Sequence, residues 1–578
     1  MRPGGQRAAG SPLRDTAHGQ DARRGELRRV CDSLWQTWLS TAAGDVYELQ
    51  RLIDPHALTK ATYGEQSSRY RHCARAKAAL DTLVSAHSTY ITPAGQRWFA
   101  LKTRKKVQEH SGRKSSLMDW YTQATEVMTD ELSETNFYNT LMEVYNDRVL
   151  GGTGCCFIGG NDELPLHFVH VPLGNFAIAE DCYGHVNTLV RRFRWTAAQA
   201  AEAWGVDALP EVVRQDYVDP ARRYDETSKR DYLHLVRPRA GMVTRGLDRV
   251  PYELREFEGF YILEDDFSII KEEGYFEFPY LVTRFMRGNE SPYGVAPGVA
   301  VIPTIRQLMK LERLQDVMAE KAAFPSILQL ASQNRQIDTR AGGITTVSLQ
   351  EAQAGYPREW GSSGRYDIGL ERIRDKEEQI RQAYFADMLN AMSQIERQMT
   401  ATEVNAREAE KVLAFSPSFH LFISDFQVAA RRILSILYRK GKLPQAGADN
   451  DLFIRSADGR EWMMNPRVCF LGKIAQAIER VQRRGIEDVL QTIISYTQAT
   501  GDSSMLESLN PRMIGRYIVE SSGAPADIIK SDAELAVLDE QKAAMMAAQQ
   551  EQQDAVAAAE VLSKAGGVAG KMQRGGAA

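Results

Sequence analysis

Residues with the spacing of a catalytic or phosphate-binding motif are sparse in this chain. The Gly-rich segment 150–160, LGGTGCCFIGG, comes nearest to a phosphate loop, but it follows a helical pattern and precedes a strand pattern. A phosphate loop needs the opposite order, in which a strand leads through the loop into a helix N-terminus. No Gly-Lys pair, including those at 441–442 and 472–473, is followed by Ser or Thr. We therefore predict a helix end and a turn at 150–160, and no P-loop ATPase.

Metal and hydrolase chemistry has equally little support. His167 and His170 lie three residues apart in a strand pattern, which places them on opposite faces and hinders their sharing a metal ion. The acidic run 264–266 lies between two strand patterns and is expected to be a hairpin turn. No HExxH zinc motif and no Gly-x-Ser-x-Gly nucleophile elbow occurs. We expect no catalytic residue, no metal, no cofactor and no enzymatic activity.

The composition is that of a large soluble protein. A chain of 578 residues exceeds a single core and predicts three or four domains. The net charge of −4 opposes tight binding of nucleic acid, which needs a basic footprint, and leaves weak contact with DNA open. Six cysteines without disulfide or metal spacing predict reduced, mostly buried thiols in a cytosolic setting. We expect neither a signal peptide nor a membrane span, because the long apolar runs that these require are missing.

Two long helical patterns are the elements that would position any site. A Gly/Asn/Ser/Pro-rich turn opens residues 287–330, Pro303 falls in the first turn of a helix of about twenty residues, and Pro325 ends it. A second charged helix is expected at about 370–398. The insertion between them, at about 326–368, has few aliphatic residues. Two long helices around a compact insertion indicate a structural part and not an active-site scaffold.

The region before the first long helix is expected to be α+β. Helical patterns occupy 26–101 and 118–150, and Thr196 has the position of an N-cap for the Ala-rich helix that follows it. The basic segment 102–106 is expected to be a solvated loop, with a phosphate-contacting patch as the alternative. Short strands separated by turn residues are expected at 155–158, 166–171, 175–180, 186–195, 231–236, 257–263, 267–273 and 278–286.

The region after the second long helix is expected to be mainly helical. Helices are predicted at 402–415 and 419–440, with a break at Ser416–Pro417. A smaller, mainly helical unit is expected at 446–535, followed by an Ala/Gln-rich tail.

This order of segments resembles the portal proteins, or head-to-tail connectors, of tailed bacteriophages, particularly those of short-tailed podoviruses. Each motif is weak alone, but several in one order are specific, and the similarity covers residues 25–550. The matching segments are the lead into the first stem helix (287–298, RGNESPYGVAPG), that helix passing into the clip (305–330), the Thr-x-Thr-Glu-Val signature (399–410), the Gly-x-Leu-Pro exit (433–444), the wing strands (170–205) and a late Gly-x-Pro segment (521–541).

The resemblance implies an α+β, mainly helical portal architecture with wing, stem, clip and crown regions and a helical C-terminal tail. The implied parts are a disordered N-terminus (1–24), a wing (25–290), a first stem helix (291–325), a clip (326–368), a second stem helix with the start of a tunnel loop (369–398), further wing helices (399–445), a crown (446–535) and a helix-prone tail that is either a barrel or disordered (536–578).

The resemblance also implies a function. Portal subunits form a ring, usually of twelve, at one capsid vertex of the virion, through which double-stranded DNA is packaged and ejected. The implied partners are the terminase large subunit, the tail adaptor protein, and the major capsid and scaffolding proteins, with assembly in the host cytoplasm and no membrane. A stem helix of about 27 residues would be roughly 40 Å long, a plausible length for a channel wall.

Two sets of residues follow from these assignments. The tunnel-loop candidates for proximity to DNA are Gln394, Arg397, Gln398 and Thr400. Arg397 has an alternative role, in which it pairs with a neighbouring glutamate.

The clip candidates for partner contact are of the residue types that dominate interface energetics. For Trp360 the alternative is to anchor the clip's own fold or the contact between adjacent clips. The clip candidates are Arg335, Arg340, Arg358, Trp360, Arg365 and Tyr366.

Two other classes of protein stay open at this point. The first is another ring-forming virion component, such as a head–tail adaptor or a tail tube protein, which would be shorter or richer in strands. The second is a terminase or nuclease, against which the missing P-loop and metal cluster argue.

Overall fold

The chain forms two compact units, Met1–Arg104 with Trp120–Ala477, and Lys105–Asp119 with Ile478–Ala578. The elements below belong to the first unit, apart from the first turns of α6 (Lys114–Glu134). The computed structural model describes residues 17–55, 72–102, 114–160, 164–240, 252–288, 290–323, 326–328, 349–354, 358–360, 366–387, 389, 401–444, 453–455, 461–463 and 466–471, with single positions at 491, 493, 495–496, 541 and 545.

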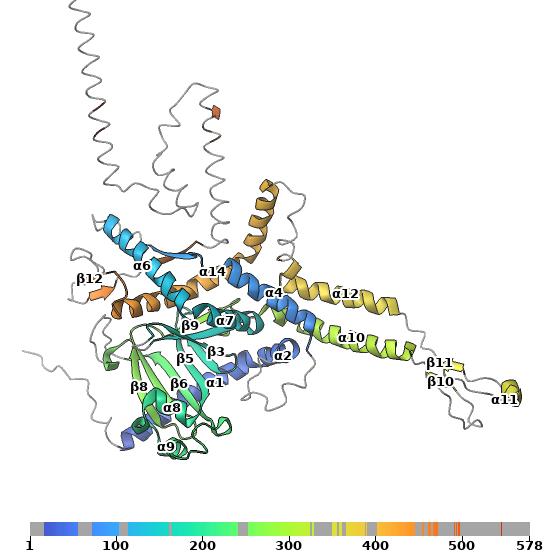
Figure 1. The fold of residues 1–578 in the computed structure, drawn as a ribbon, viewed down its shortest axis with the longest axis horizontal. Helices are drawn as coiled ribbons and strands as arrows, with labels where there is room; N and C mark the ends of the chain where they lie inside the picture. Colours follow the sequence, from blue (N-terminus) through green and yellow to red (C-terminus); the bar gives the residue numbers. More distant parts are fainter. Residues whose placement is uncertain are drawn as a thin grey trace, which may run out of the picture. The chain divides into compact units, whose positions relative to one another are not determined.

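The larger sheet is a five-stranded antiparallel meander whose side chains alternate between two cores. Leu233 and Leu235 pack with α1 (Ala17–Thr41) on one face, whereas Tyr232 packs on the other face with α8 (Ala197–Trp204) and α9 (Glu211–Val218). Figure 1 shows these helices around the sheet. Its strands, paired in sequence order, are β4 (Phe176–Glu180), β5 (Val186–Trp195), β6 (Arg230–Pro238), β7 (Phe257–Leu263) and β8 (Ile269–Tyr275).

The smaller sheet has the order β3 (His167–Val171), β2 (Thr153–Gly159), β9 (Tyr280–Arg284). Helix α7 (Phe137–Gly151) packs against β2 and β3, and the long helix α14 (Ala401–Arg439) packs against β9. These strands and those of the meander lie where the sequence predicts them.

The Gly-rich segment 150–160 is a helix end and a turn, as predicted. Helix α7 ends at Gly151, and Gly152 follows in the left-handed conformation with φ of 84°. A Cβ atom on Gly152 would lie 2.2 Å from the carbonyl oxygen of Gly294, so both the backbone angle and the space require glycine. Strand β2 then begins at Thr153.

Two predicted turns and caps are also confirmed. Thr196 caps α8 in a reciprocal capping box with Gln199, whose backbone N–H donates to the threonine hydroxyl. Residues 264–266 form the turn between β7 and β8.

Cys31, Cys73, Cys155 and Cys156 are buried free thiols, whereas Cys182 is exposed.

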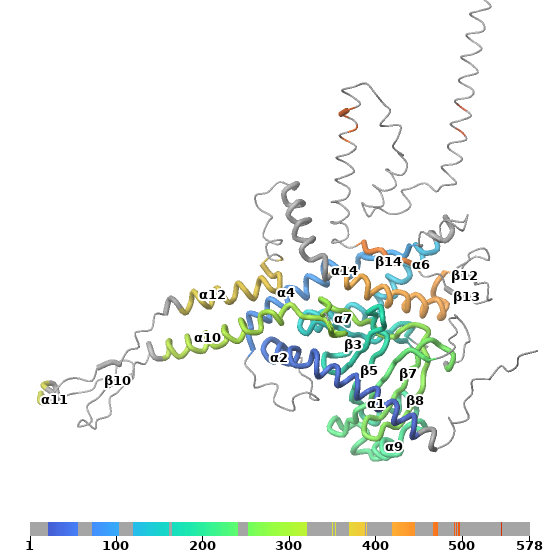
Figure 2. The backbone as a smooth tube through the Cα atoms, turned by 180° about the vertical axis from the view of Figure 1, so that it is seen from behind, coloured from blue at the N-terminus to red at the C-terminus, as the bar shows by residue number. Residues whose placement is uncertain are grey.

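Helices α10 (Ile302–Ala323) and α12 (Tyr366–Ala383) form an antiparallel pair, and they lie side by side in Figure 1 and in Figure 2. The 3₁₀ turn η6 (Pro297–Val301) leads into α10. Three short elements lie between the two helices in sequence, β10 (Ser326–Leu328), α11 (Leu349–Ala354) and β11 (Arg358–Trp360), and β10 pairs antiparallel with β11. Helices α2 (Ala43–Ile53) and α4 (Ala74–Tyr90) contact the pair.

The structure corrects the expectation of helix throughout 26–101. Residues Phe99–Lys102 form strand β1, which pairs with β14 (Arg467–Phe470). The partner strand is more than 360 residues away in the sequence, so the local residue pattern could not predict this pairing. It also lies inside the region expected to be mainly helical, where β12 (Phe453–Arg455) and β13 (Glu461–Met463) add a further strand pair.

Three predicted helix boundaries are wrong. Helix α1 begins at Ala17, inside the segment expected to be disordered, because Arg23 pairs with Glu272 at 2.6 Å and lies over the Phe260 ring. Helix α12 ends at Ala383, because the left-handed Phe385, with φ of 57°, interrupts the helix predicted at about 370–398; helical residues resume at Ala386 and Asp387, and the predicted end near 398 lies outside the described residues. Helix α14 continues through Ser416–Pro417, where proline costs one backbone hydrogen bond but does not end the helix.

Candidate assembly site on the α10–α12 helix pair

Each helix of the α10–α12 pair has one narrow buried stripe. On α10, Ile305 and Leu308 are fully buried, and on α12 Ile373 and Ile380 face inward. This is the apolar spacing that the sequence predicts for the first helix. These stripes cover only one face of each helix.

The remaining faces of the pair carry exposed apolar and charged side chains. Leu314 is 49% exposed, Val317 39% and Leu370 39% in the single chain. Leu314 and Val317 are three residues apart on α10 and therefore lie on one face of the helix. The exposed charged residues are Arg306, Lys310, Arg313, Asp316 and Glu320 on α10, and Glu371, Arg372, Arg374, Asp375, Glu378 and Arg381 on α12.

Ion pairs fasten the helix pair to the helices before it. Arg75 of α4 lies 3.4 Å from a carboxylate oxygen of Glu312 on α10 and also pairs with Glu377 on α12. Arg306 of α10 pairs with Glu48 of α2. One guanidinium thus joins both long helices to α4, although the partly exposed geometry keeps the stabilisation modest.

Tyr384 anchors the end of α12 in the rest of the first unit, which we call the body. Its side chain is fully buried, and its hydroxyl lies 2.2 Å from where a Cβ of Gly298 would be, so the turn before α10 must have glycine there. Burial raises the pKa of the Tyr384 phenol well above its ordinary value, so the group stays neutral. The next residue, Phe385, is left-handed and interrupts the helix, and helical residues resume at Ala386 and Asp387.

Helix α14 is held on the smaller sheet by buried charges. Asp425 accepts a hydrogen bond from the backbone N–H of Arg284 at 3.2 Å. Arg432 donates to the carbonyl oxygen of Ile158 at 2.8 Å and lies 3.7 Å from a carboxylate oxygen of Glu277. Burial raises the pKa of Asp425 to about 6, against the lowering effect of the Arg284 guanidinium.

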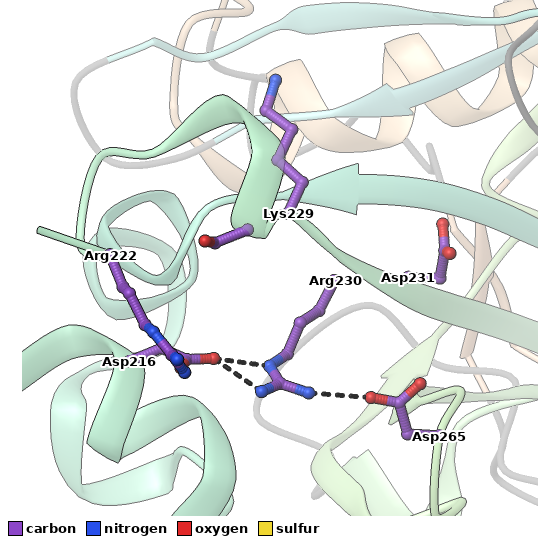
Figure 3. Close-up of a pocket in the computed structure, with 7 residues that line it drawn as sticks. Asp216, Arg222, Lys229, Arg230, Asp231 and Asp265 are labelled. Atoms are coloured by element: carbon purple, nitrogen blue, oxygen red, sulfur yellow. Dashed lines mark hydrogen bonds and ion pairs between the residues drawn. The ribbon is translucent and has the colours of Figure 1, made fainter. Parts of the chain in front are cut away.

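A polar hollow of about 280 Å³ lies between α9 and the turn that joins β7 to β8. Figure 3 shows Arg230 between Asp216 and Asp265, with Lys229 pointing away from them. The Arg230–Asp216 and Arg230–Asp265 distances are 2.7 and 2.9 Å, and Arg222 lies 3.2 Å from Asp216. The positive and negative side chains that line the hollow neutralise one another, and their ion pairs fasten α9 to the sheet.

The described residues contain neither a cluster of metal ligands nor a membrane-spanning helix. Among the residues that the structure describes, no group of three or more His, Cys, Asp or Glu could hold a metal ion. His167 is exposed, whereas His170 is directed to Asp147 at 2.8 Å. No described helix is long and apolar enough to cross a membrane.

The structure describes the backbone of three clip candidates. Arg358 and Trp360 lie in β11, opposite Leu328 and Ser326 of β10, and Tyr366 begins α12. The clip candidates Arg335, Arg340 and Arg365 lie outside the described residues. So do all four tunnel-loop candidates, Gln394, Arg397, Gln398 and Thr400, and most of the basic segment 102–106.

Sequence reasoning missed the residues that anchor these helices. Arg75 meets partners more than 230 residues away, and Asp425 meets Arg284 across 141 residues. Neither residue belongs to a motif. A charged residue on the apolar face of a helix is the signal that could have pointed to Asp425, since it lies three residues after Phe422 and one before Phe426, both fully buried.

Comparison with known proteins gives one family. Its model, described as "Bacteriophage head to tail connecting protein", matches residues 30–529. A "Probable portal protein" of Bordetella phage BPP-1 is 26% identical over 348 residues, 59% of this chain and 60% of that protein. A "Portal protein" of Salmonella phage epsilon15 is 24% identical over 370 residues, 63% of this chain and 65% of that protein. The chain thus matches less than two thirds of the length of either relative.

Asp425 should give the protein a pH-dependent stability. Burial raises the folded-state pKa of Asp425 from its ordinary value of 3.8 to about 6. The protonated carboxyl therefore stabilises the folded state, fully below about pH 4, and this stabilisation is lost as the pH rises through about 6. Asp425→Asn removes the titration. The melting temperature of the wild type relative to this variant should fall between pH 4.5 and 7.5, with a change in relative free energy of about 2 kcal/mol.

The matched control is Asp130→Asn, at an exposed position of α6. A difference between wild type and Asp425→Asn that is the same at both pH values would contradict the role given to Asp425.

Proposed function

Because the chain belongs to the bacteriophage head-to-tail connecting protein family, we propose that it is the portal subunit of a tailed phage. Copies form a ring at one capsid vertex, and double-stranded DNA is packaged and ejected through its channel. Both curated relatives that match the chain are named for this role, which supports the proposal.

The observation that carries the proposal is that the α10–α12 pair leaves apolar side chains exposed in the single chain. Helices α10 and α12 bury one stripe each and leave Leu314, Val317 and Leu370 exposed in the single chain. Helices of 22 and 18 residues are roughly 33 and 27 Å long, enough to form the wall of a channel. Side-by-side copies would cover these faces, and the ring is the closed arrangement that head-to-tail contacts produce.

The exposed charges that neighbouring copies leave uncovered suit passage of DNA without tight binding. Side chains of both signs occur along α10 and α12, and the whole chain has a net charge of −4. A wall that held phosphates strongly would stop a sliding duplex, because each phosphate contact adds to the affinity. The subunit carries the DNA path and needs no chemistry of its own, since a separate terminase motor supplies the work.

The regional assignments follow from this role. The α+β part at 25–290, with helices at 399–445, is the wing, and α10 and α12 are the stem helices. The β10–β11 pair and α11 belong to the clip, 446–535 is the crown, and 536–578 is the tail. The clip docks first the terminase large subunit and then the tail adaptor. Capsid and scaffolding proteins surround the ring, which assembles in the host cytoplasm and stays in the virion.

The first test is the size of the purified protein. The wild type should form one large ring species in mass photometry. Leu314→Glu should weaken ring formation, because half-burying leucine contributes on the order of 1 kcal/mol at each contact and a buried carboxylate opposes it. Val212→Glu, on α9 and 46% exposed, is the matched control and should assemble normally. A wild-type protein that stays monomeric at all protein and salt concentrations would refute the proposed function.

The second test concerns the tunnel loop. Alanine at Gln394, Arg397, Gln398 and Thr400 should leave ring assembly intact and reduce DNA packaging or retention, because these side chains are proposed to lie near the duplex. Ring mass and packaged DNA per particle are the two measurements. Variants that fail to assemble would show instead that the segment is a packing element, with Arg397 paired to a neighbouring glutamate.

The third test concerns the clip. Deletion of residues 333–364 should leave the melting transition of the wing in place and abolish capture of the phage's tail adaptor in a pull-down. The reason is that the deletion removes β11 and α11 while the wing keeps its own cores. Undiminished adaptor capture would assign adaptor binding to the wing or to the C-terminal region.

A further inference from the structure

Two stripes of opposite charge run along the outer faces of the helix pair with the same spacing. Arg306, Lys310 and Arg313 on α10 are separated by four and three residues, which aligns them on one helix face. Glu371, Asp375 and Glu378 on α12 are separated by four and three residues as well. One helix therefore presents a basic stripe, and its partner presents an acidic stripe of the same length.

The two stripes lie at the same heights along the pair. Gly369 of α12 lies against Gln315 of α10, where a Cβ on the glycine would be 2.6 Å from the glutamine Oε1. From that contact toward the body, Arg313 and Glu371 are each two residues away, and Arg306 and Glu378 are each nine residues away. Lys310 and Asp375 are five and six residues away, a difference of one helical rise, about 1.5 Å.

The stripes do not face each other within one chain. At about 100° per residue, the basic stripe lies roughly 130° around α10 from its buried positions, and the acidic stripe lies roughly 170° around α12 from its own. All six side chains are exposed. Among the residues that the structure describes, no carboxylate pairs with Lys310 or Arg313, and no cation pairs with Glu371 or Asp375. Arg306 pairs with Glu48, and Glu378 accepts a hydrogen bond from Gln382 at 3.3 Å.

We propose that these stripes join neighbouring copies of the chain, with Arg313 facing Glu371 and Lys310 facing Asp375 of the next copy. Arg306 and Glu378 extend the row at its inner end. The inference rests on the proposed ring, and it adds which faces meet and in what register. Rotation about an axis along the helices places α10 of one copy beside α12 of the next without changing either height.

Ring closure explains why the two faces must differ. A head-to-tail contact joins unlike surfaces, so each copy needs two complementary faces, and the opposite charges meet that need. A shift along the helices by one turn would leave one charge of each row unpaired, so the rows favour the unshifted register. DNA is the less suitable occupant of the acidic stripe, because carboxylates repel phosphate.

The test uses two single charge reversals. Arg313→Glu and Glu371→Arg each place like charges at every contact, so each variant alone should form rings at least about tenfold less readily than the wild type. An equimolar mixture of the two should form rings again. In the mixture each reversed side chain meets its complement on the other variant, so copies alternate around the ring.

Mixing restores ring formation only if the two residues pair between copies of the chain. It would not restore an ion pair that forms inside one chain. The double variant Arg313→Glu/Glu371→Arg should also assemble, and Arg29→Glu, an exposed position on α1 with the same charge change, should behave as the wild type. Mass photometry of all six samples gives the answer. A wild-type ring with unaffected single variants, or a mixture that stays unassembled, would overturn the register and leave the ring itself standing. A monomeric wild type would instead refute the proposed function.

Discussion

Two antiparallel helices can bury only the faces that they turn to each other, and this limit governs the α10–α12 pair. Ile305, Leu308, Ile373 and Ile380 use up that face, and the rest of each helix stays in water with charges of both signs and a few large apolar side chains. A pair of this kind has too little core to be held by itself. It depends on the body at one end and, in our account, on other copies along its sides.

The body supplies rigid anchors at both ends of the returning chain. Arg75 joins α4 to both long helices, Tyr384 locks the end of α12 against Gly298, and Asp425 and Arg432 fix α14 to the smaller sheet. These contacts fasten α12 and α14 to the same unit.

Much of the fold could be read from local pattern. Strand periodicity placed β2 to β9 within a few residues, Thr196 announced its capping box, and the prolines bracketed α10. The failures share one cause. β1 depends on a partner strand more than 360 residues away, α12 ends because Phe385 takes a left-handed conformation, and α14 passes through Pro417 because its following turns pack Phe419, Phe422 and Phe426 into the core. The ion pairs and hydrogen bonds of Arg75 and Asp425 could not be predicted for the same reason, because their partners are distant in the sequence and meet them only in the folded chain.

The central claim is that copies stand side by side with their α10–α12 pairs around a common axis. Cryo-electron microscopy of the assembled wild-type protein tests it most directly, because it gives rotational symmetry and helix positions together. The account predicts a closed ring whose axial channel is wide enough for duplex DNA and is walled by these helices. A ring with the helix pairs on its outer rim, or an assembly without a central channel, would contradict it.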